Sequence, residues 1–383
     1  MKNILALIAR EFKLFYANKV LLMLFIGAPI MYGILIGSVY QKGKVTELPV
    51  IVVDEDQSSM SRKLIDMIQE NEVVDIVQVL PHIFNSRTLA LEKEATVVVH
   101  IPQGFMRNIQ QAQVPEVALF VDGSNTLTSN SALMAIVTVA TTMKAGILIE
   151  GQQKKGVPAY IATQAYEPFK TSIIKQNIRS GNYLYFMLPG VLLTVFQQVL
   201  LLGLALSFAS EFELNTFSEL VKKSRKPLLL LLVKIVPYLL MSVGIMALYY
   251  GYSLWYRMPL QVDFWPFFWS TILFVMAVCC IGVLVSIAIP TQLKATEILM
   301  VIATPSFILS GYTWPSSQMP TWVQAIADVI PLTHYLRIFR LLFIEQAPSE
   351  LIRQPMLALG IIAAVCFVLS VLLLHLKIKK VKY

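Results

Sequence analysis

The 383-residue chain carries 31 basic and 23 acidic side chains, so only 14% of it is charged, against about 25% in ordinary soluble domains. Apolar residues make up 56% and the mean hydropathy is +0.67, which excludes a disordered chain, a coiled coil and an ordinary cytosolic enzyme. The net charge of +8 is typical of either nucleic-acid binding or the cytoplasmic edges of membrane helices, and its position along the chain decides between them.

Membrane-spanning helices are predicted from uncharged runs, because about 20 apolar residues are needed to cross a bilayer. Six such runs predict an α-helical polytopic membrane protein with six transmembrane helices, plus an α/β extracytoplasmic domain inserted between helices 1 and 2. In chain order we predict an amphipathic cytoplasmic interface helix over 1–19, TM1 over 20–41, the extracytoplasmic domain over 42–180, TM2 over 181–210, a cytoplasmic loop over 211–227, TM3 over 228–256, TM4 over 264–290, TM5 over 295–313, extracytoplasmic re-entrant or short helices over 314–353, TM6 over 354–376 and a basic cytoplasmic tail over 377–383.

The N-terminal helix is predicted from apolar residues at helical spacing, from Ile4 to Phe15, with Lys2, Arg10 and Lys13 at other positions. The alternative is that this segment simply extends the first span. The first span is too long for a cleavable signal, and no A-x-A-like site follows Tyr40.

The insert, residues 42–180, has the composition of a water-soluble domain. Its pattern predicts an α/β fold, with strands over 48–53, 73–79, 96–101 and 117–121 and helices over 58–70, 83–94 and 124–152. A seventh uncharged run, 123–143, is rejected as a span because nearly half of its residues are Ser, Thr or Asn. The acidic residues Asp54, Glu55 and Asp56 are interpreted as a solvated turn before a helix, in preference to a metal site.

The distribution of basic residues predicts the orientation. Fourteen of them flank the spans on one side, whereas the short loops on the other side carry only Arg257, Arg337, Arg340 and Arg353. Both termini should therefore be cytoplasmic and no nucleic-acid partner is needed. Lys234 and Glu297 are interpreted as residues at the membrane boundary.

The cytoplasmic loop reads EFELNTFSELVKKSRK from Glu211 to Lys226. Thr216 and Glu219 have the spacing of a capping box, and Phe217, Leu220 and Val221 fall on one face of the short helix that follows. A docking helix for a soluble partner and an interfacial helix on lipid headgroups are both compatible with this pattern.

The segment after the fifth span is broken by Pro305, Pro315 and Pro320, with Gly311 at the same level. Broken helices at membrane depth are tolerated only where protein or a water-lined cavity covers them, so we predict a re-entrant element near a translocation route.

Taken together, SGYTWPSSQMP from Ser310 to Pro320, IPLTHYLRIFR from Ile330 to Arg340 and the loop EFELNTFSEL resemble the ABC-2-type (type V) ABC transporter permeases. Asn215 stands where the family usually has Gly, which Asn tolerates better than most residues do. The insert resembles the branch with a large extracytoplasmic domain, in PVIVVDEDQSSMSRKLI, VVVHIPQGFMRNI and LFVDGSN.

The resemblance implies two sets of functional residues. The ATPase-coupling set is Glu211, Glu213, Asn215, Thr216, Phe217, Glu219 and Leu220. The extracytoplasmic gate or re-entrant set is Ser310, Gly311, Pro315, Met319, Pro320, Pro331 and Arg340. Catalytic and metal-binding residues are not expected on this chain, and substrate-binding residues are not identified.

The resemblance also implies the partners: two cytoplasmic ABC ATPase subunits that hold ATP and Mg, and a second permease copy or a paralogue, in a bacterial plasma (inner) membrane. The resemblance does not decide whether a periplasmic adaptor takes part. No phosphate-binding G-x-x-x-x-G-K-[ST] motif occurs in the sequence. The few polar groups inside the spans (Gln197, Gln198, Ser242 and Thr271) favour an amphipathic or hydrophobic, drug-like or lipid-linked cargo. The resemblance implies that this cargo is exported. The main alternative is a membrane-anchored sensor or assembly protein with a ligand-binding extracytoplasmic domain.

Overall fold

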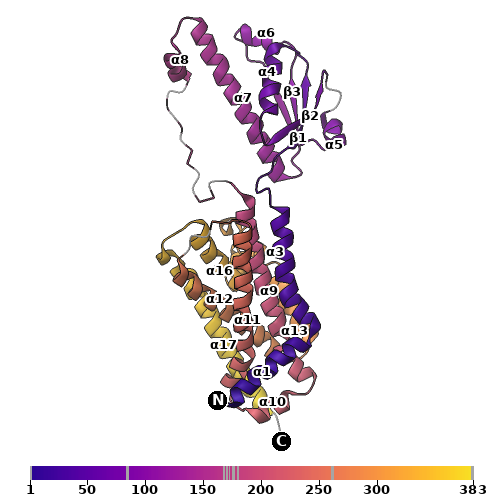
Figure 1. Cartoon of the computed structure of the whole chain (residues 1–383), viewed down its shortest axis with the longest axis vertical. Helices are drawn as coiled ribbons and strands as arrows, with labels where there is room; N and C mark the ends of the chain where they lie inside the picture. Colours follow the sequence, from indigo (N-terminus) through magenta and orange to yellow (C-terminus); the bar gives the residue numbers. More distant parts are fainter. Residues whose placement is uncertain are drawn as a thin grey trace. The chain divides into compact units, whose positions relative to one another are not determined.

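The computed structural model describes residues 2–82, 86–166, 169, 171, 173–174, 177–178, 181–259 and 263–380. Two compact units make up the fold (Figure 1). The first, which we call the helical unit, combines Met1–Gly43 with Lys175–Tyr383, and the second, the α/β unit, is Lys44–Ile174. The start of the second unit lies close to the predicted start of the insert at residue 42.

The helical unit is a bundle of long apolar helices. Its helices are α1 (Lys2–Ala17), α2 (Lys19–Leu22), the π-helix η1 (Met23–Gly27), α3 (Ala28–Val39), α9 (Tyr183–Glu213), α10 (Phe217–Lys223), α11 (Pro227–Trp255), α12 (Phe264–Ala288), α13 (Gln292–Ala303), α14 (Ser306–Leu309), η2 (Ser316–Gln318), α15 (Thr321–Ala327), α16 (Pro331–Phe339), η3 (Arg340–Ile344), η4 (Ser349–Ile352) and α17 (Arg353–Lys380). Helix α9 is the central helix, packed against α3, α12 and α13 and buried along most of its length.

Both chain ends lie at the same end of this bundle as α10 (Figure 1). Arg10 on α1 contacts Glu211 at the end of α9, and Lys377 near the end of α17 lies 5.0 Å from the ring centroid of Phe212. This arrangement is the one expected for an even number of crossings between the termini.

Close contact between α3 and α11 depends on two glycines four residues apart. A Cβ atom at Gly33 would lie about 2 Å from the ring of Tyr252, and one at Gly37 equally close to the ring of Tyr256. The Tyr252 hydroxyl donates a hydrogen bond to the Ile30 carbonyl at 2.9 Å. Small residues at this spacing let two apolar helices approach closely. The two glycines are visible in the sequence, although this helix contact was not predicted from them.

In the described part of the chain, seven helices are long and apolar enough to cross a membrane. Six of them are in the helical unit, near the six predicted spans, with α13 and α14 counted together. The seventh is α7 (Thr126–Lys154), which belongs to the α/β unit and covers the rejected run 123–143. Helix α7 buries Ala132, Ile136 and Val139 in the same core as the strands of that unit.

The α/β unit contains a four-stranded sheet in the order β2-β1-β3-β4. The strands are β1 (Leu48–Asp54), β2 (Val74–Leu80), β3 (Val97–Ile101) and β4 (Ala118–Val121), and the helices are α4 (Ser59–Gln69), α5 (Ser86–Glu92), α6 (Phe105–Gln110), α7 and α8 (Ala159–Tyr166). Strands β2, β1 and β3 run parallel and β4 is antiparallel to β3. The four predicted strands are therefore present, α6 and α8 were not predicted, and residues 83–85 of the predicted helix 83–94 lie outside the described residues.

The acidic turn after β1 is held by hydrogen bonds inside the protein. Asp54 accepts from the Asp56 and Gln57 backbone N–H groups, and Asp56 accepts from those of Gly104 and Met106 at 2.9 and 3.0 Å. Burial raises the pKa of Asp56, but the hydrogen bonds from Ser58 and from the α6 backbone outweigh it and leave this pKa below its ordinary value. The interpretation as a solvated turn is wrong for Asp54, which is buried at the end of β1, whereas Glu55 and Asp56 are half-buried in the turn that leads to α4.

Candidate functional site

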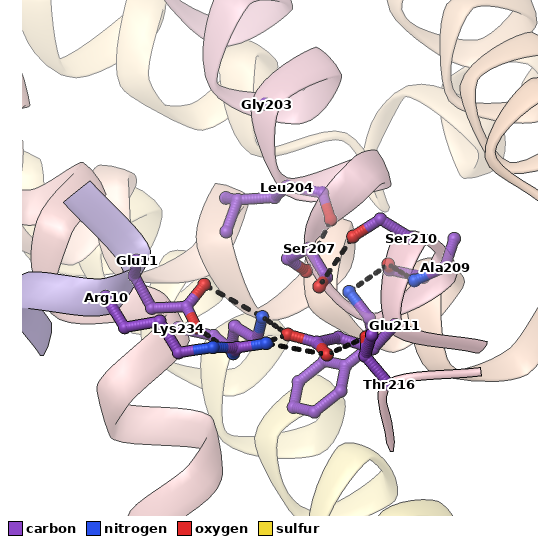
Figure 2. A network of polar contacts seen from close by, with 12 residues as sticks. Arg10, Glu11, Gly203, Leu204, Ser207, Ala209, Ser210, Glu211, Thr216 and Lys234 are labelled. Carbon is purple, nitrogen blue, oxygen red and sulfur yellow. Dashed lines mark hydrogen bonds and ion pairs between the residues drawn. The ribbon is translucent and has the colours of Figure 1, made fainter. Parts of the chain in front are cut away.

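Four charged side chains meet at the end of the bundle where both termini lie (Figure 2). The guanidinium of Arg10 binds both carboxylate oxygens of Glu211, with N–O distances of 2.7 and 3.1 Å. Lys234 Nζ lies 2.8 Å from a carboxylate oxygen of Glu11 and 2.8 Å from one of Glu211. Arg10 also contacts Glu11 at 3.0 Å. These four residues, which we call the charge cluster, contain two cations and two anions and are formally neutral.

The Lys234–Glu211 pair of the charge cluster is buried, whereas the Arg10 and Glu11 side chains are 24% and 10% exposed. Lys234 is 1% exposed and Glu211 2% exposed, and the Lys234 ammonium lies 5.5 Å from the ring centroid of Phe208. The prediction that Lys234 reaches out to the membrane boundary is therefore wrong. A buried lysine is tolerated here because two carboxylates lie within hydrogen-bonding distance, whereas an unpaired buried charge would be strongly destabilising. The hydrogen bond with Glu211 is the main cause that raises the pKa of Arg10, so this cation stays charged.

Thr216 joins the charge cluster to α10. Its hydroxyl donates to the Glu211 oxygen Oε2, and Thr216 is the residue immediately before α10. The predicted capping box between Thr216 and Glu219 does not form, since the Thr216 side chain makes no capping hydrogen bond to the helix backbone. A carboxylate is a stronger acceptor than a neutral group, which explains why the hydroxyl binds Glu211.

Glu213, one half-turn further along α9, binds a different helix. Its carboxylate accepts a hydrogen bond of 2.9 Å from the backbone N–H of Gln292, the first residue of α13. A carboxylate at a helix N-terminus is favourable because the first N–H groups lack partners within the helix. Both acids were predicted to lie in the loop 211–227, but α9 continues through Glu213, so its last turn is bound to α1 and α11 through one acid and to α13 through the other.

The apolar face of α10 packs into the bundle. Phe217 is 7%, Leu220 1% and Val221 3% exposed, and the Phe217 ring contacts that of Phe212. Phe217 and Leu220, which the resemblance assigns to the ATPase-coupling set, hold α10 against the end of α9. The residues left at the surface are Leu214, Asn215, Glu219, Lys222 and Lys223.

Asn215 has the left-handed conformation, with φ of +57°. This agrees with the expectation that Asn replaces Gly at a position of positive φ. Asn215 therefore forms the left-handed turn between α9 and α10. Leu214, beside it, is 67% exposed.

Side chains from two other helices bind the backbone of α9 just before the charge cluster. Ser286 on α12 accepts hydrogen bonds of 2.9 Å from the N–H groups of both Phe208 and Ala209, and donates to the Ala205 carbonyl at 2.8 Å. The Tyr238 hydroxyl on α11 donates to the Gly203 carbonyl at 2.8 Å. The last three turns of α9 are thus bound to α11 and α12 through the main chain of α9.

The predicted re-entrant segment lies near the opposite end of α9. Helix α13 ends at Ala303, α14 is a single turn, and Gly311 has φ of +75°, so the chain reverses there. Tyr312 is buried against Gly190, and its hydroxyl donates to the Phe186 carbonyl near the start of α9 at 2.6 Å. The predicted helix break is therefore present, in contact with the first turns of α9.

The other predicted residues of this segment shape its turns. Ser310 donates to the Phe307 carbonyl, the Met319 carbonyl accepts from Gln324, and Arg340 pairs with Glu345 at 3.0 Å. Each of the prolines precedes or opens a short helix: Pro315 η2, Pro320 α15 and Pro331 α16. The structure brings this set together within one segment and places the coupling set at the other end of α9.

Gln197 on α9 holds the break in place. Its side-chain amide donates to Ser306 Oγ at 3.2 Å, and its carbonyl accepts from the Leu332 backbone N–H at 3.1 Å. The residue is 1% exposed. Three of the four polar residues expected inside the spans are thus bonded within the protein, since Thr271 also pairs with the Tyr335 hydroxyl and Ser242 with the Tyr238 carbonyl.

Comparison with known proteins gives the family. The model of the ABC-2 family transporter proteins matches residues 19–372, which is most of the chain. This chain belongs to the ABC-2 transporter family. It is 23% identical over 324 residues to the probable multidrug ABC transporter permease YbhR of Escherichia coli K12, covering 84% of each chain. It is 21% identical to the inner membrane transport permease YhhJ of the same strain, covering 97% of this chain and 96% of that one.

Within this ABC-2 permease, sequence reasoning missed Arg10 and Glu11. They precede the residues that the family model matches, yet they supply half of the charge cluster. The available signal was Lys234, a single charge inside the long apolar stretch from Leu228 to Tyr256, which calls for an acidic partner. Glu211 was identified by resemblance, but its burial against α1 and α11 was not.

Proposed function

We propose that this chain is the transmembrane permease subunit of an ABC exporter, which moves an amphipathic or hydrophobic substrate, drug-like or lipid-linked, out of the cytoplasm or the inner leaflet. ATP hydrolysis takes place on two separate cytoplasmic ATPase subunits, which bind ATP and Mg. Family membership and the multidrug permease name of the relative YbhR support this proposal. The absence of a P-loop motif from the sequence agrees with it.

One observation carries the coupling role: the last turn of α9 binds three other helices through Glu211 and Glu213, immediately before α10. A force applied to α10 is transmitted to α1, α11 and α13 together, because charge-assisted hydrogen bonds connect them. The surface offered to an ATPase subunit is then Leu214, Asn215 and Glu219, while Phe217 and Leu220 fix the helix to the bundle.

The orientation of the proposed permease follows from charge. The end with α10 carries the basic tail and the residues Lys222, Lys223, Arg225 and Lys226, so we place it in the cytoplasm of a bacterial inner membrane, with residues 42–180 outside. We keep six crossings per chain and leave α7 outside the membrane, since it contributes Ala132, Ile136 and Val139 to the core of the α/β unit.

The substrate route is proposed to lie between two permease copies. Many side chains along α3, α11, α13 and α17 are large, apolar and exposed in the single chain, among them Met31, Val243, Val301 and Leu357. Gln197, Ser242 and Thr271, polar side chains inside the bundle, are used for internal hydrogen bonds. These two observations favour an amphipathic or apolar substrate over a permeant ion.

Purification of the tagged, full-length chain from its native membrane tests the proposal. We expect an ABC ATPase subunit to co-purify, and a double substitution of the exposed turn, Leu214→Asp with Glu219→Lys, to reduce its recovery at least about tenfold by reversing the local charge and removing an apolar contact.

Glu350→Lys is the matched control, because Glu350 is an exposed acid at the other end of the bundle. It should leave both ATPase recovery and the ATP hydrolysis of the purified complex unchanged. Absence of any nucleotide-binding subunit from the wild-type preparation would instead favour the membrane-anchored sensor.

A further inference from the structure

A cavity of about 550 Å³ lies in the helical unit beside the re-entrant segment, at the end of the bundle opposite the charge cluster. Helices α14, α15 and α16 and the turn after Gly311 surround it. Its polar lining includes Ser316, Asp328, Thr333, His334, Arg337 and Arg340. None of these residues belongs to the coupling site. Arg337, one of the two arginines of the lining, has no hydrogen bond to any described residue.

The two arginines and the threonine share one side of α16 and its continuation. Thr333, Arg337 and Arg340 are spaced four and three residues apart, so they follow a single helical face. The opposite side of the helix, with Leu332, Tyr335 and Ile338, is buried. The basic side chains are therefore placed together by the same amphipathic pattern that packs α16 into the bundle.

The hydrogen-bonding capacity of this face is only partly used. Arg340 Nε binds Glu345 at 3.0 Å, whereas Arg337 is exposed and has no ion pair or hydrogen bond to any residue that the structure describes. The Thr333 hydroxyl oxygen is buried and also lacks a partner among those residues. Buried hydroxyls are normally hydrogen-bonded, so an unpartnered one in a cavity wall indicates a group that enters from outside the chain.

His334 and Asp328 complete the wall. The His334 ring nitrogen Nε2 lies 2.8 Å from the Asp328 backbone carbonyl, which fixes the orientation of the ring. Asp328 is the only acidic side chain among the cavity-lining residues, and Glu345 lies behind Arg340. Arg340 is paired with Glu345, so Arg337 is the guanidinium of this wall that has no ion pair to any described residue, and its free N–H donors suit an anion.

The surroundings of the cavity place it at the level of lipid headgroups. Trp314 and Trp322 are 57% and 67% exposed on the segments that enclose the cavity, close to exposed Ile326 and Val329. Exposed tryptophans gather where the apolar core of a bilayer meets water. The predicted loops at this end of the bundle carry just four arginines, and two of them line this one cavity.

We propose that this cavity binds the phosphodiester headgroup of a membrane lipid. Arg337 and Arg340 contact the phosphate oxygens, since planar guanidinium groups match them in geometry, and the Thr333 hydroxyl donates a further hydrogen bond. The acyl chains leave past the exposed apolar side chains beside Trp322. The proposal goes beyond permease activity and concerns binding alone, so it is tested without an ATPase.

The test is a titration of the full-length chain in detergent with short-chain phosphatidylglycerol, followed by native mass spectrometry. We expect saturable binding of one lipid per chain that Arg337→Gln and Arg340→Gln each weaken about tenfold and Thr333→Val weakens less, because a hydrogen bond to a charged group is stronger from a cation than from a hydroxyl. Diacylglycerol of the same chain length, which has no phosphate, should not bind.

Two further arms distinguish the source of the phosphate and the specificity of the cavity. Inorganic phosphate should bind far more weakly than the lipid, and equal affinity would overturn the lipid assignment in favour of a free-anion site. Arg353→Gln removes an exposed arginine at the start of α17, outside the cavity lining, and should leave binding unchanged. An equal loss with Arg353→Gln would overturn the proposal, since it would reflect general attraction between basic residues and anionic lipid. Unchanged thermal unfolding of each variant shows that the fold is retained.

Discussion

The two ends of the helical unit are stabilised in different ways. At the end with α10, four charged residues and Thr216 form a network in which every charge is paired, with Lys234 and Glu211 buried at its centre. At the other end, uncharged groups such as Gln197, Ser306 and Tyr312 connect a broken helix to α9. A cavity lies beside them, and its Arg337 has no ion pair to any described residue. A closed charge network resists separation of its helices, whereas neutral hydrogen bonds around a cavity can rearrange at lower cost.

This difference agrees with different proposed roles for the two ends of α9. The end with α10 would transmit a movement of the ATPase subunits to the bundle. The end with the helix break would change conformation to release the substrate. Substitutions at each end test this difference.

Removing a single member of the charge cluster should have the largest effect. Lys234→Met leaves Glu11 and Glu211 opposite Arg10 alone, so one buried carboxylate loses its partner and the stability falls by about 3–5 kcal/mol. Adding Glu211→Gln restores neutrality, because Arg10 and Glu11 then remain as a pair, and the double variant should lose less than the two single variants together. Thermal unfolding in detergent measures each change.

Lys226→Met is the control for this series. Lys226 is an exposed lysine immediately before α11, and its substitution should change stability by less than about 0.5 kcal/mol. Equal losses for Lys226→Met and Lys234→Met would show that the charge cluster has no special importance.

A smaller loss is expected from Gln197→Leu at the other end. This change leaves the buried N–H of Leu332 without an acceptor, at a cost of about 1–3 kcal/mol. Gln198→Leu is the matched control, since the neighbouring side chain is half-buried and makes no hydrogen bond to any described residue. If both variants unfold at the same temperature, Gln197 does not hold the helix break.

Gly311→Ala tests the chain reversal itself. A residue with a side chain at φ of +75° costs about 1–2 kcal/mol, and the added Cβ would lie 3.4 Å from that of Ser316. Gly244→Ala, inside α11 with open space around it, should be neutral or slightly stabilising. Thermal unfolding again gives the comparison, and identical shifts would contradict the proposed strain.

The smallest effect concerns the acidic turn of the α/β unit. Because the pKa of Asp56 is lower in the folded state, its carboxylate stabilises the start of α6 at neutral pH, and this contribution is lost as pH falls from about 4 through the lower folded-state value. Asp56→Asn should speed hydrogen exchange at Gly104 and Met106 at neutral pH. Exchange unchanged by the substitution would show that the carboxylate does not hold these N–H groups.

The helices of the bundle and the strands of the sheet could be predicted, because each has one clear sequence pattern. Long apolar runs gave the helices of the bundle, and β-rich runs bounded by turns gave all four strands. Helices α6 and α8 were missed because each has only two turns and little periodicity, so tertiary contacts decide whether they form.

The candidate site was less predictable for a physical reason. Resemblance identified Glu211 and Thr216, but local spacing suggested a capping box and a surface role, whereas Lys234 and Arg10 bind Glu211 from 23 and 201 positions away. Pairing over such distances leaves no local pattern in the sequence. Lys234, the single charge in a long apolar stretch, was the sequence signal for a buried ion pair. It was assigned to the membrane boundary instead.

Ser286 gives α9 a pivot near the charge cluster. Since its hydroxyl accepts from the N–H groups of Phe208 and Ala209, a bend of α9 at this point would leave both donors bonded even as the helix's own hydrogen bonds lengthen. The final turn would then tilt together with the groups of α1, α11 and α13 that Glu211 and Glu213 bind. A single hydroxyl on a neighbouring helix would thereby decide where the longest helix of the bundle bends.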